Sequence, residues 1–278
     1  MLDPSHHRAR YLAEGIALVP DVLPPAQIER LHAAVAEIVA QAPADVRDVT
    51  PYLAADGTQA VAYPGGYYVE HLSQHAPRLA DLLAASDLPR LACDLLGCDE
   101  VVFWRDEIHY KTPNSDANAT PWHHGAASFP FKGEDALTLW LPLTEVGDQD
   151  GPLLTIAGTH RDTQVRYRPP TRARAADDDG ATYRTIPDFD ALAAAGGARI
   201  DRWTMAAGGA LGFHPYLVHG SAPNRGGRPR IAYVSRWLGR DARYEPDAYS
   251  VAEPGIDVAA LRDGLFDDPA FPRFRRAG

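Results

Sequence analysis

The sequence predicts a mainly β fold with flanking α-helices, built as a jelly roll of two antiparallel sheets. From residue 101 onwards, apolar and polar residues alternate with a period of two, which is typical of strands. Loops rich in Gly, Pro, Asn and Asp separate these segments, and few helical patterns interrupt them. This arrangement favours a double-stranded β-helix of the cupin-like type over a βαβ fold. The predicted strands span 101–110, 137–143, 152–157, 210–214 and 231–238.

Helical patterns lie mainly before the predicted strands. Apolar residues recur on one face of 25–41, and a pair of prolines at 24 and 25 suits the start of a helix. Shorter helices are predicted at 78–85 and 88–96, and Gly97 has the position of a C-terminal cap. A last short helix is expected at 189–195, within the long polar segment that follows residue 160.

Length and composition favour a single domain. A chain of 278 residues with 45% hydrophobic content can bury one large core, and no shift in composition marks a linker. We therefore expect one domain over 1–278. It would have a helical N-terminal part at 1–100, a jelly-roll core at 101–240 and a C-terminal extension at 241–278.

The charge balance and the cysteines exclude several classes of protein. Acidic residues outnumber basic ones by 37 to 27, which gives a formal charge of −10 and disfavours nucleic-acid polymers and anionic membranes as partners. Cys93 and Cys98 lack the C-x-x-C spacing of metal or redox motifs and are expected to be buried thiols of a reducing compartment. Neither a signal-peptide pattern nor a membrane-length apolar run occurs, so a cytoplasmic location is expected.

Two histidines have positions that suit metal ligands. A metal that must also bind oxygen, such as iron(II), needs protein nitrogen ligands on rigid strands together with open coordination positions. His123 lies just before a predicted strand and His219 just after one, so each could project from a strand end into the mouth of a barrel. A single histidine is more often a structural residue, and the interpretation therefore depends on what surrounds these two.

An arginine near the second histidine strengthens the interpretation. Arg230 opens the predicted strand 231–238, eleven residues beyond His219, and a guanidinium there could bind a carboxylate such as that of 2-oxoglutarate. Ser221 could add a hydroxyl group to the same carboxylate. The alternative is a surface charge, since Arg225, Arg228 and Arg236 show that arginines are common in this segment.

Blocks of sequence in this order and spacing resemble the phytanoyl-CoA dioxygenase family of iron(II)/2-oxoglutarate oxygenases. The resemblance covers most of the chain and fades after about residue 241. The matching blocks are EGIALVPDVLPPAQIERL, HYKTP, TPWHHG, ALTLWLPLTEV, DGPLLTIAGTHR and GFHPYLVHGSAPNRGGRPRIA.

The resemblance implies a role for each matching residue. His123 and His219 would be the two iron ligands, and Arg230 would bind the distal carboxylate of 2-oxoglutarate. Lys111 and Ser221 would assist Arg230. Trp140 matches a position that lines the cosubstrate pocket in the family, although a core tryptophan would look the same in the sequence.

The chain departs from the family pattern at one position. The family has His-x-Asp, in which the Asp completes the iron ligands, whereas this sequence has Gly125 in place of the Asp. Loss of the carboxylate leaves room for an anion, and chloride suits that position sterically and electrostatically. The His-x-Gly motif is similar to that of iron-dependent halogenases. It implies that oxygen converts 2-oxoglutarate to succinate while an unactivated carbon of a biosynthetic substrate is chlorinated, with placement of that carbon deciding the outcome.

Two other functions stay open. A hydroxylase could use water, or a carboxylate from Asp106, Glu107 or Glu134, in place of the lost Asp. A protein that has lost iron chemistry could only bind a ligand, although such a protein would not be expected to keep both histidines, the arginine and the lysine. A single sequence also does not distinguish a natural Gly125 from an engineered one.

The substrate is expected to be a free small molecule. Arginines follow residue 160 in an otherwise acidic chain, which would suit an anionic substrate, although a solvated loop has the same composition. Carrier proteins are usually acidic, so a carrier-bound substrate is disfavoured. Candidate substrate residues are Arg161, Arg166 and Arg168 in this segment, with Tyr67 and Tyr68 from the N-terminal part.

Overall fold

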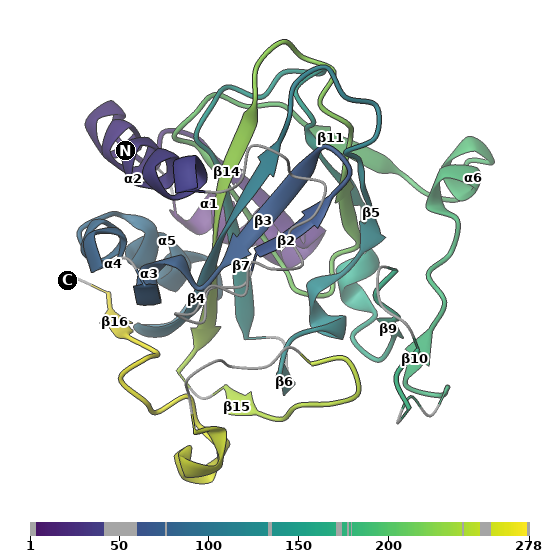
Figure 1. The fold of residues 1–278 in the computed structure, drawn as a ribbon. Helices are drawn as coiled ribbons and strands as arrows, with labels where there is room; N and C mark the ends of the chain where they lie inside the picture. The colour runs from purple at the N-terminus through teal and green to yellow at the C-terminus, as the bar shows by residue number, and fades with distance from the viewer. Residues whose placement is uncertain are drawn as a thin grey trace.

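Two antiparallel sheets form the centre of the structure, a computed structural model (Figure 1). It describes residues 4–41, 60–75, 77–132, 135–170, 174–176, 178, 180–240, 242–250 and 257–276. The larger sheet runs in the order β1 (Ile16–Val19), β12 (Ala210–Phe213), β7 (Ala136–Pro142), β14 (Arg230–Gly239), β4 (Glu100–Lys111), β3 (Gly66–Glu70) and β2 (Ala60–Tyr63), with β16 (Arg273–Arg275) paired to β4. The smaller sheet runs in the order β11 (Ile200–Trp203), β8 (Leu153–Ile156), β13 (His219–Ser221) and β5 (Thr120–His123).

Short strand pairs and helices complete the fold. The pairs are β6 (Phe131–Lys132) with β15 (Arg243–Tyr244) and β9 (Arg166–Tyr167) with β10 (Tyr183–Arg184). The helices are α1 (Pro4–Glu14), α2 (Pro25–Gln41), α3 (Leu72–His75), α4 (Pro77–Ala84), α5 (Leu88–Leu96) and α6 (Phe189–Ala194). Single 3-10 turns occur at η1 (Gly125–Ala127), η2 (Thr159–Arg161), η3 (Val258–Ala260) and η4 (Arg262–Gly264). In Figure 1, α2 to α5 gather on one side of the larger sheet, and α6 lies on the opposite side of the molecule.

The two faces of the larger sheet have different surroundings. Strand residues alternate between faces, so Ile108 packs with the helices in the main apolar cluster, together with Leu139 and Tyr233 of the neighbouring strands. The opposite face packs against the smaller sheet through a second cluster that includes Trp140 and Phe213. Polar side chains of the barrel interior therefore project from this second face.

The fold class predicted from the sequence is confirmed. The five predicted strands correspond to β4, β7, β8, β12 and β14, and the predicted helices to α2, α4, α5 and α6. Gly97 adopts the left-handed conformation at φ +73° and caps α5 by donating its N–H to the Cys93 carbonyl at 2.8 Å.

Both ends of the chain contribute to the larger sheet in a way that the expected three-part division does not describe. Three strands of the expected helical part, β1, β2 and β3, extend the sheet, and β16 of the expected C-terminal extension pairs with β4. The sequence patterns do not predict α1 or these four strands; each of the strands is five residues or shorter and has little room for a periodic pattern.

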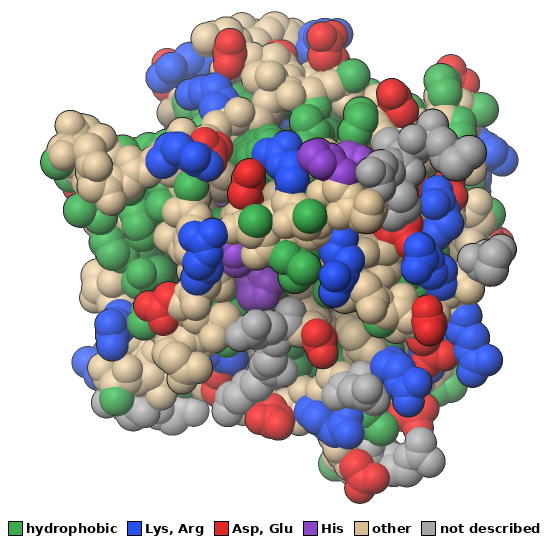
Figure 2. All heavy atoms as spheres, turned by 180° about the vertical axis from the view of Figure 1, so that it is seen from behind, with side chains coloured by type: hydrophobic (Ala, Val, Ile, Leu, Met, Phe, Trp, Pro, Cys, Tyr) green, Lys and Arg blue, Asp and Glu red, His purple; other side chains and the backbone are tan. Residues whose placement is uncertain are grey.

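The described surface carries mixed charges. Lys and Arg side chains are interspersed with Asp and Glu side chains on the face shown in Figure 2, so the described part of that face presents no broad basic surface. None of the helices in the described ranges has the length and apolar character needed to cross a membrane. Cys93 is buried and Cys98 partly buried, and both are free thiols.

Candidate active site

Two histidines lie side by side on neighbouring strands of the smaller sheet. His123 ends β5 and His219 begins β13, and the two residues are direct partners in the antiparallel register. Their ring centroids are 4.2 Å apart, and both residues are partly accessible. The fold thus brings together the two residues that the sequence analysis proposes as metal ligands.

Hydrogen bonds leave one nitrogen of each ring available. His123 Nδ1 lies 2.9 Å from the Pro121 carbonyl, and His219 Nδ1 lies 2.8 Å from the Leu217 carbonyl. A carbonyl oxygen only accepts, so each Nδ1 carries the hydrogen and each Nε2 keeps a lone pair. Burial lowers the pKa of both imidazoles, that of His219 well below its ordinary value. Two neutral imidazoles with fixed orientation are donors that fit iron(II).

Gly125 starts a turn two residues after His123, and an aromatic ring fills the position of its absent side chain. A Cβ atom built on Gly125 would lie 2.5 Å from Cζ and 2.8 Å from Cε2 of Phe129. The Phe129 ring is held between Trp104, at 4.8 Å between centroids, and Phe131, at 5.3 Å. The Arg236 guanidinium lies 5.1 Å from the Phe129 ring centroid. The electropositive edge of the ring therefore points towards Gly125.

The carboxylates considered as substitutes for the lost Asp are engaged elsewhere. Asp106 lies on the helix-covered face of β4, where it accepts hydrogen bonds from the Ser73 amide at 3.0 Å and the Tyr233 hydroxyl at 2.8 Å. Glu107 lies on the interior face but pairs with neighbouring basic side chains, and Glu134 falls outside the described residues. Within the described ranges, no group of three His, Cys, Asp or Glu side chains is arranged to hold a metal ion.

Two buried basic side chains stand next to each other at the end of the β4–β14 pair. Lys111 and Arg230 are register partners with exposed fractions of 0% and 2%. Burial, and then the charge of Arg230, lowers the pKa of Lys111 to about 6. The Lys111 Nζ donates to the Ala222 carbonyl at 2.9 Å, and the Arg230 guanidinium lies 5.6 Å from the centre of the Trp140 ring. A dianion bound between these groups would offset their repulsion, which fits 2-oxoglutarate.

Ser221 joins the two parts of the site. It lies on β13 two residues after His219, and its hydroxyl donates to Thr120 Oγ1 at 2.8 Å. The next residue, Ala222, supplies the carbonyl that binds Lys111. The candidate metal ligand His219 and the buried Lys111 are therefore connected through one short segment of chain.

Charged and polar side chains line the interior face of β4. The sequence patterns did not identify them as candidates for substrate binding. Glu107 and His109 alternate with Asp106 and Ile108, so they share the face that carries Lys111. Arg236, on β14, pairs with Glu107 from the same face. Strand alternation backward from Lys111 could have identified these residues, since a period of two places 107, 109 and 111 together.

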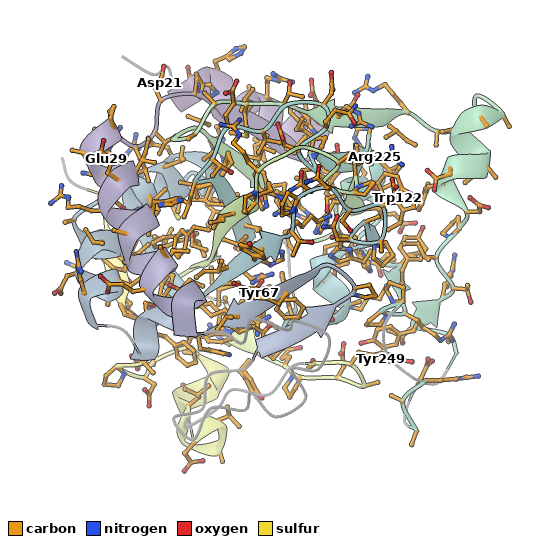
Figure 3. The ribbon with its side chains drawn as sticks, turned by 45° about the horizontal axis from the view of Figure 1, so that its top comes forward. Asp21, Glu29, Tyr67, Trp122, Arg225 and Tyr249 are labelled. Carbon is orange, nitrogen blue, oxygen red and sulfur yellow. The ribbon has the colours of Figure 1, made fainter. Side chains whose placement is uncertain are left out.

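The two candidate tyrosines lie on opposite faces of β3. Tyr68 faces the interior, where its ring stacks on His109 at 5.6 Å between centroids. Tyr67 is buried in the helix-side cluster and stacks on Tyr110 at 4.8 Å. Figure 3 shows Tyr67 near α2, whereas Trp122, the neighbour of His123, lies towards α6. Only Tyr68 is placed to meet a substrate in the barrel.

The candidate arginines after residue 160 have partners within the protein. Arg161 donates to the Ala13 carbonyl, Arg166 pairs with Asp247 at 2.5 Å, and Arg168 pairs with Asp178 at 2.5 Å. Arg166 and Arg168 are thus paired with carboxylates, whereas Arg161 binds a backbone carbonyl.

Comparison with known proteins places this geometry among related enzymes. The sequence profile of the family described as phytanoyl-CoA dioxygenase (PhyH) matches residues 11–232. L-proline trans-4-hydroxylase of Streptomyces griseoviridis is 29% identical over 164 residues, which cover 56% of this chain and 60% of that protein. The peroxisomal phytanoyl-CoA dioxygenase of Rattus norvegicus is 25% identical over 162 residues, covering 56% and 46%. The chain therefore matches less than two thirds of the length of these curated relatives.

Solved structures share the fold over nearly the whole chain. The epimerase SnoN from nogalamycin biosynthesis, crystallised with Fe3+, alpha ketoglutarate and nogalamycin RO, has a TM-score of 0.73 at 20% identity, covering 97% of this chain and 98% of that one. EctD from S. alaskensis, solved with 2-oxoglutarate and 5-hydroxyectoine, has a TM-score of 0.65 at 20% identity, covering 93% and 84%. The profile match, which spans most of the chain, shows that this protein belongs to the phytanoyl-CoA dioxygenase (PhyH) family of iron- and 2-oxoglutarate-dependent oxygenases.

Proposed function

We propose that the protein is an iron(II)/2-oxoglutarate-dependent halogenase that chlorinates an unactivated carbon of a free small molecule. His123 and His219 would hold the metal. Arg230 and Lys111, assisted by Ser221, would hold 2-oxoglutarate. The observation that carries the proposal is Gly125, which lacks a carboxylate and faces the edge of Phe129.

The surroundings of Gly125 favour an anion over a neutral ligand. The edge of the Phe129 ring that meets Gly125 is electropositive. The guanidinium of Arg236 lies over the face of the same ring. After burial, the charge of Arg236 is among the causes that lower the pKa of both His123 and His219, and its ion-pair partner Glu107 acts in the opposite sense on His123. Chloride next to Gly125 would restore the single negative charge that the family's Asp supplies.

The reaction balances without a further cofactor. Substrate R–H, chloride, 2-oxoglutarate, O2 and one proton would give R–Cl, succinate, CO2 and water. Bound iron(II) would supply oxygen activation coupled to the decarboxylation of 2-oxoglutarate. The protein's own contribution is placement: neutral imidazoles orient the metal, the Lys111–Arg230 pair fixes the cosubstrate, and the barrel wall positions the substrate carbon near the halide.

Hydroxylation is the second candidate, because a relative matched over half of the chain is a proline hydroxylase. In that case water would stand where the Asp is missing, and the product would gain oxygen. The likeness of the fold to an epimerase and a carbocyclase does not decide between these outcomes, since one fold supports several oxidations.

Chloride binding can be tested before the substrate is known. The protein is loaded with iron(II) and 2-oxoglutarate without oxygen, and chloride is titrated while the visible absorption band of the complex is recorded. We expect a saturable, chloride-dependent shift that bromide also produces at a different wavelength. Gly125→Asp should abolish the shift while the 2-oxoglutarate band persists, because the carboxylate would occupy the halide position, whereas Gly125→Ala, whose Cβ meets the Phe129 ring equally, should retain the shift. A shift of equal size in Gly125→Asp would refute halide binding at this position.

A metabolite panel with oxygen then separates the functions. Products with the chlorine isotope pattern in mass spectra support the halogenase, and products that contain only added oxygen support the hydroxylase. Absence of substrate-dependent succinate across the panel would favour a protein that only binds a ligand.

A further inference from the structure

A row of charged side chains lines the interior face of the sheet opposite the metal histidines. Arg105 and Arg236 both pair with Glu107, and Arg105 also pairs with Glu70 on the neighbouring strand. These four groups are buried or nearly so, and their charges compensate one another. His109 ends the row, with its Nε2 at 2.8 Å from Glu107 Oε2.

The partners of His109 fix which of its nitrogens can accept a hydrogen bond. Burial opposes ionisation of Glu107, but the charge of Arg236 and the bond from His109 hold its pKa well below the ordinary value. An ionised carboxylate only accepts, so His109 Nε2 carries the hydrogen and donates it. Burial lowers the pKa of His109, so the ring is neutral and Nδ1 keeps a lone pair. Such a nitrogen binds a hydroxyl or amine N–H and not a carboxylate or phosphate oxygen.

His109 lies next to Lys111 and Arg230, the two residues proposed to bind 2-oxoglutarate. Along β4 it stands two residues before Lys111, a separation of about 7 Å along the strand, and its carbonyl accepts from Arg230 Nη1 at 3.4 Å. His109 lies on the face of β4 that also carries Lys111, and this face of the larger sheet packs against the smaller sheet, which carries His123 and His219. Its side chain is 29% exposed, against 3% for Glu107. His109 is therefore the accessible end of an otherwise buried network.

We propose that His109 is a substrate-binding residue whose Nδ1 accepts a hydrogen bond from a hydroxyl or amine group of the substrate. Glu107 acts as the positioning residue that fixes the ring, and Tyr68, stacked on His109, offers an aromatic surface to the adjoining apolar part of the substrate. The substrate class is thus a small alcohol or amine. This inference rests on the proposed metal and 2-oxoglutarate site, because it places the donor group relative to both.

Two probes of matched shape test the hydrogen bond directly. Cyclohexanol has the donor hydroxyl, and methoxycyclohexane replaces it with an ether. The protein is loaded with Mn(II), which is paramagnetic and supports no turnover, together with 2-oxoglutarate, and the relaxation enhancement of the probe protons is measured by NMR. We expect Mn(II)-dependent enhancement for cyclohexanol and a response at least roughly fivefold weaker for methoxycyclohexane, the ratio expected of one hydrogen bond.

Variants then assign the difference to His109. His109→Phe should remove the preference for cyclohexanol, and His109→Gln, which can still accept from the probe, should retain most of it. Tyr110→Phe, the adjoining residue on the opposite face, is the matched control and should behave as the unmodified protein. An equal response to both probes, or a preference that survives in His109→Phe, would overturn the inference.

If the protein lacks the proposed metal and 2-oxoglutarate site, the same samples give a different result. Binding of Mn(II) and 2-oxoglutarate is followed by water-proton relaxation before any probe is added. Loss of that signal in the unmodified protein would refute the metal and cosubstrate site and the substrate inference with it. A normal signal without a cyclohexanol preference would overturn only the role of His109.

Discussion

Aromatic rings close the space where a side chain at position 125 would lie. The Phe129 ring stands 2.5 Å from the position of a Cβ atom and is confined by two other aromatic rings, so it has little room to retreat. We expect Gly125→Ala to lower the free energy of unfolding by about 1–3 kcal/mol, the usual range for overpacking. Urea denaturation measures the change. Gly227→Ala is the matched control, because a Cβ there has open space around it; equal effects of the two substitutions would contradict the packing argument.

The protonation of the Lys111 amine should depend on whether 2-oxoglutarate is bound. In the unliganded protein, burial and Arg230 hold its pKa near 6, so at pH 8 the amine is neutral. A dicarboxylate bound between Lys111 and Arg230 favours the ammonium form and raises the pKa, so binding should take up a proton. Isothermal titration of 2-oxoglutarate into the metal-loaded protein at pH 8, in buffers of different ionisation enthalpy, should give an uptake approaching one proton. Lys111→Met should abolish this uptake; an unchanged value there would assign the proton to another group.

At the scale of the element, β4 separates two kinds of polar residue by strand alternation. Glu107, His109 and Lys111 face the barrel, whereas Asp106 faces α3 and is fully buried with the Tyr233 hydroxyl. Residues 106–111 thus supply one wall of the proposed site on the inner face. On the outer face they supply Asp106, which accepts a hydrogen bond from the Ser73 amide of α3. Sequence alone does not say which face is inside, because both faces of this strand are covered.

Because Asp106 is buried against the Tyr233 hydroxyl, the stability of the protein should depend on pH. Burial raises its pKa to about 6, from an ordinary value of 3.8. A raised folded-state pKa favours folding when the group is protonated, so its contribution is complete below about pH 4 and is lost as pH rises through 6. The loss is on the order of 3 kcal/mol. We expect the stability of the unmodified protein relative to Asp106→Asn to fall by that order between pH 4 and pH 7, as measured by urea denaturation. A constant difference would contradict the raised pKa.

At the scale of the whole molecule, the sequence predicted what depends on local periodicity and missed what depends on tertiary contact. The alternating strands and α2 have long patterns. His123 and His219 were proposed as ligands from their place beside predicted strands and from the family resemblance, but β5 and β13, the short strands that carry them, were not predicted. The position of Phe129 against Gly125 could not be predicted, because it depends on the packing of Trp104, which comes from a different strand, against Phe129 and its neighbour Phe131. The segment Arg273–Arg275 has two charged residues in three and shows no strand pattern, yet it pairs with β4.

The C-terminal segment joins the proposed halide position through an apolar cluster. Phe271 is 2% exposed and packs on Phe266 at 5.0 Å between centroids. Phe266 contacts Phe131 at 6.3 Å, and Phe131 contacts Phe129, the ring that faces Gly125. A cavity at the far end of this chain of rings should therefore loosen Phe129.

Phe271→Ala tests this connection against a neighbour that lies in a different cluster. The substitution should lower the free energy of unfolding by about 3–5 kcal/mol in urea denaturation and should also weaken the chloride-dependent absorption shift, because the Phe129 edge is less firmly held. Phe274→Ala is the matched control: Phe274 is only partly buried and packs on Trp237, at 5.7 Å, beside the helix-side cluster. It should cost less stability and leave chloride affinity unchanged. If both variants weakened chloride binding in proportion to their lost stability, the effect would be one of general unfolding. A selective loss in Phe271→Ala would show that the halide position depends on packing from the end of the chain.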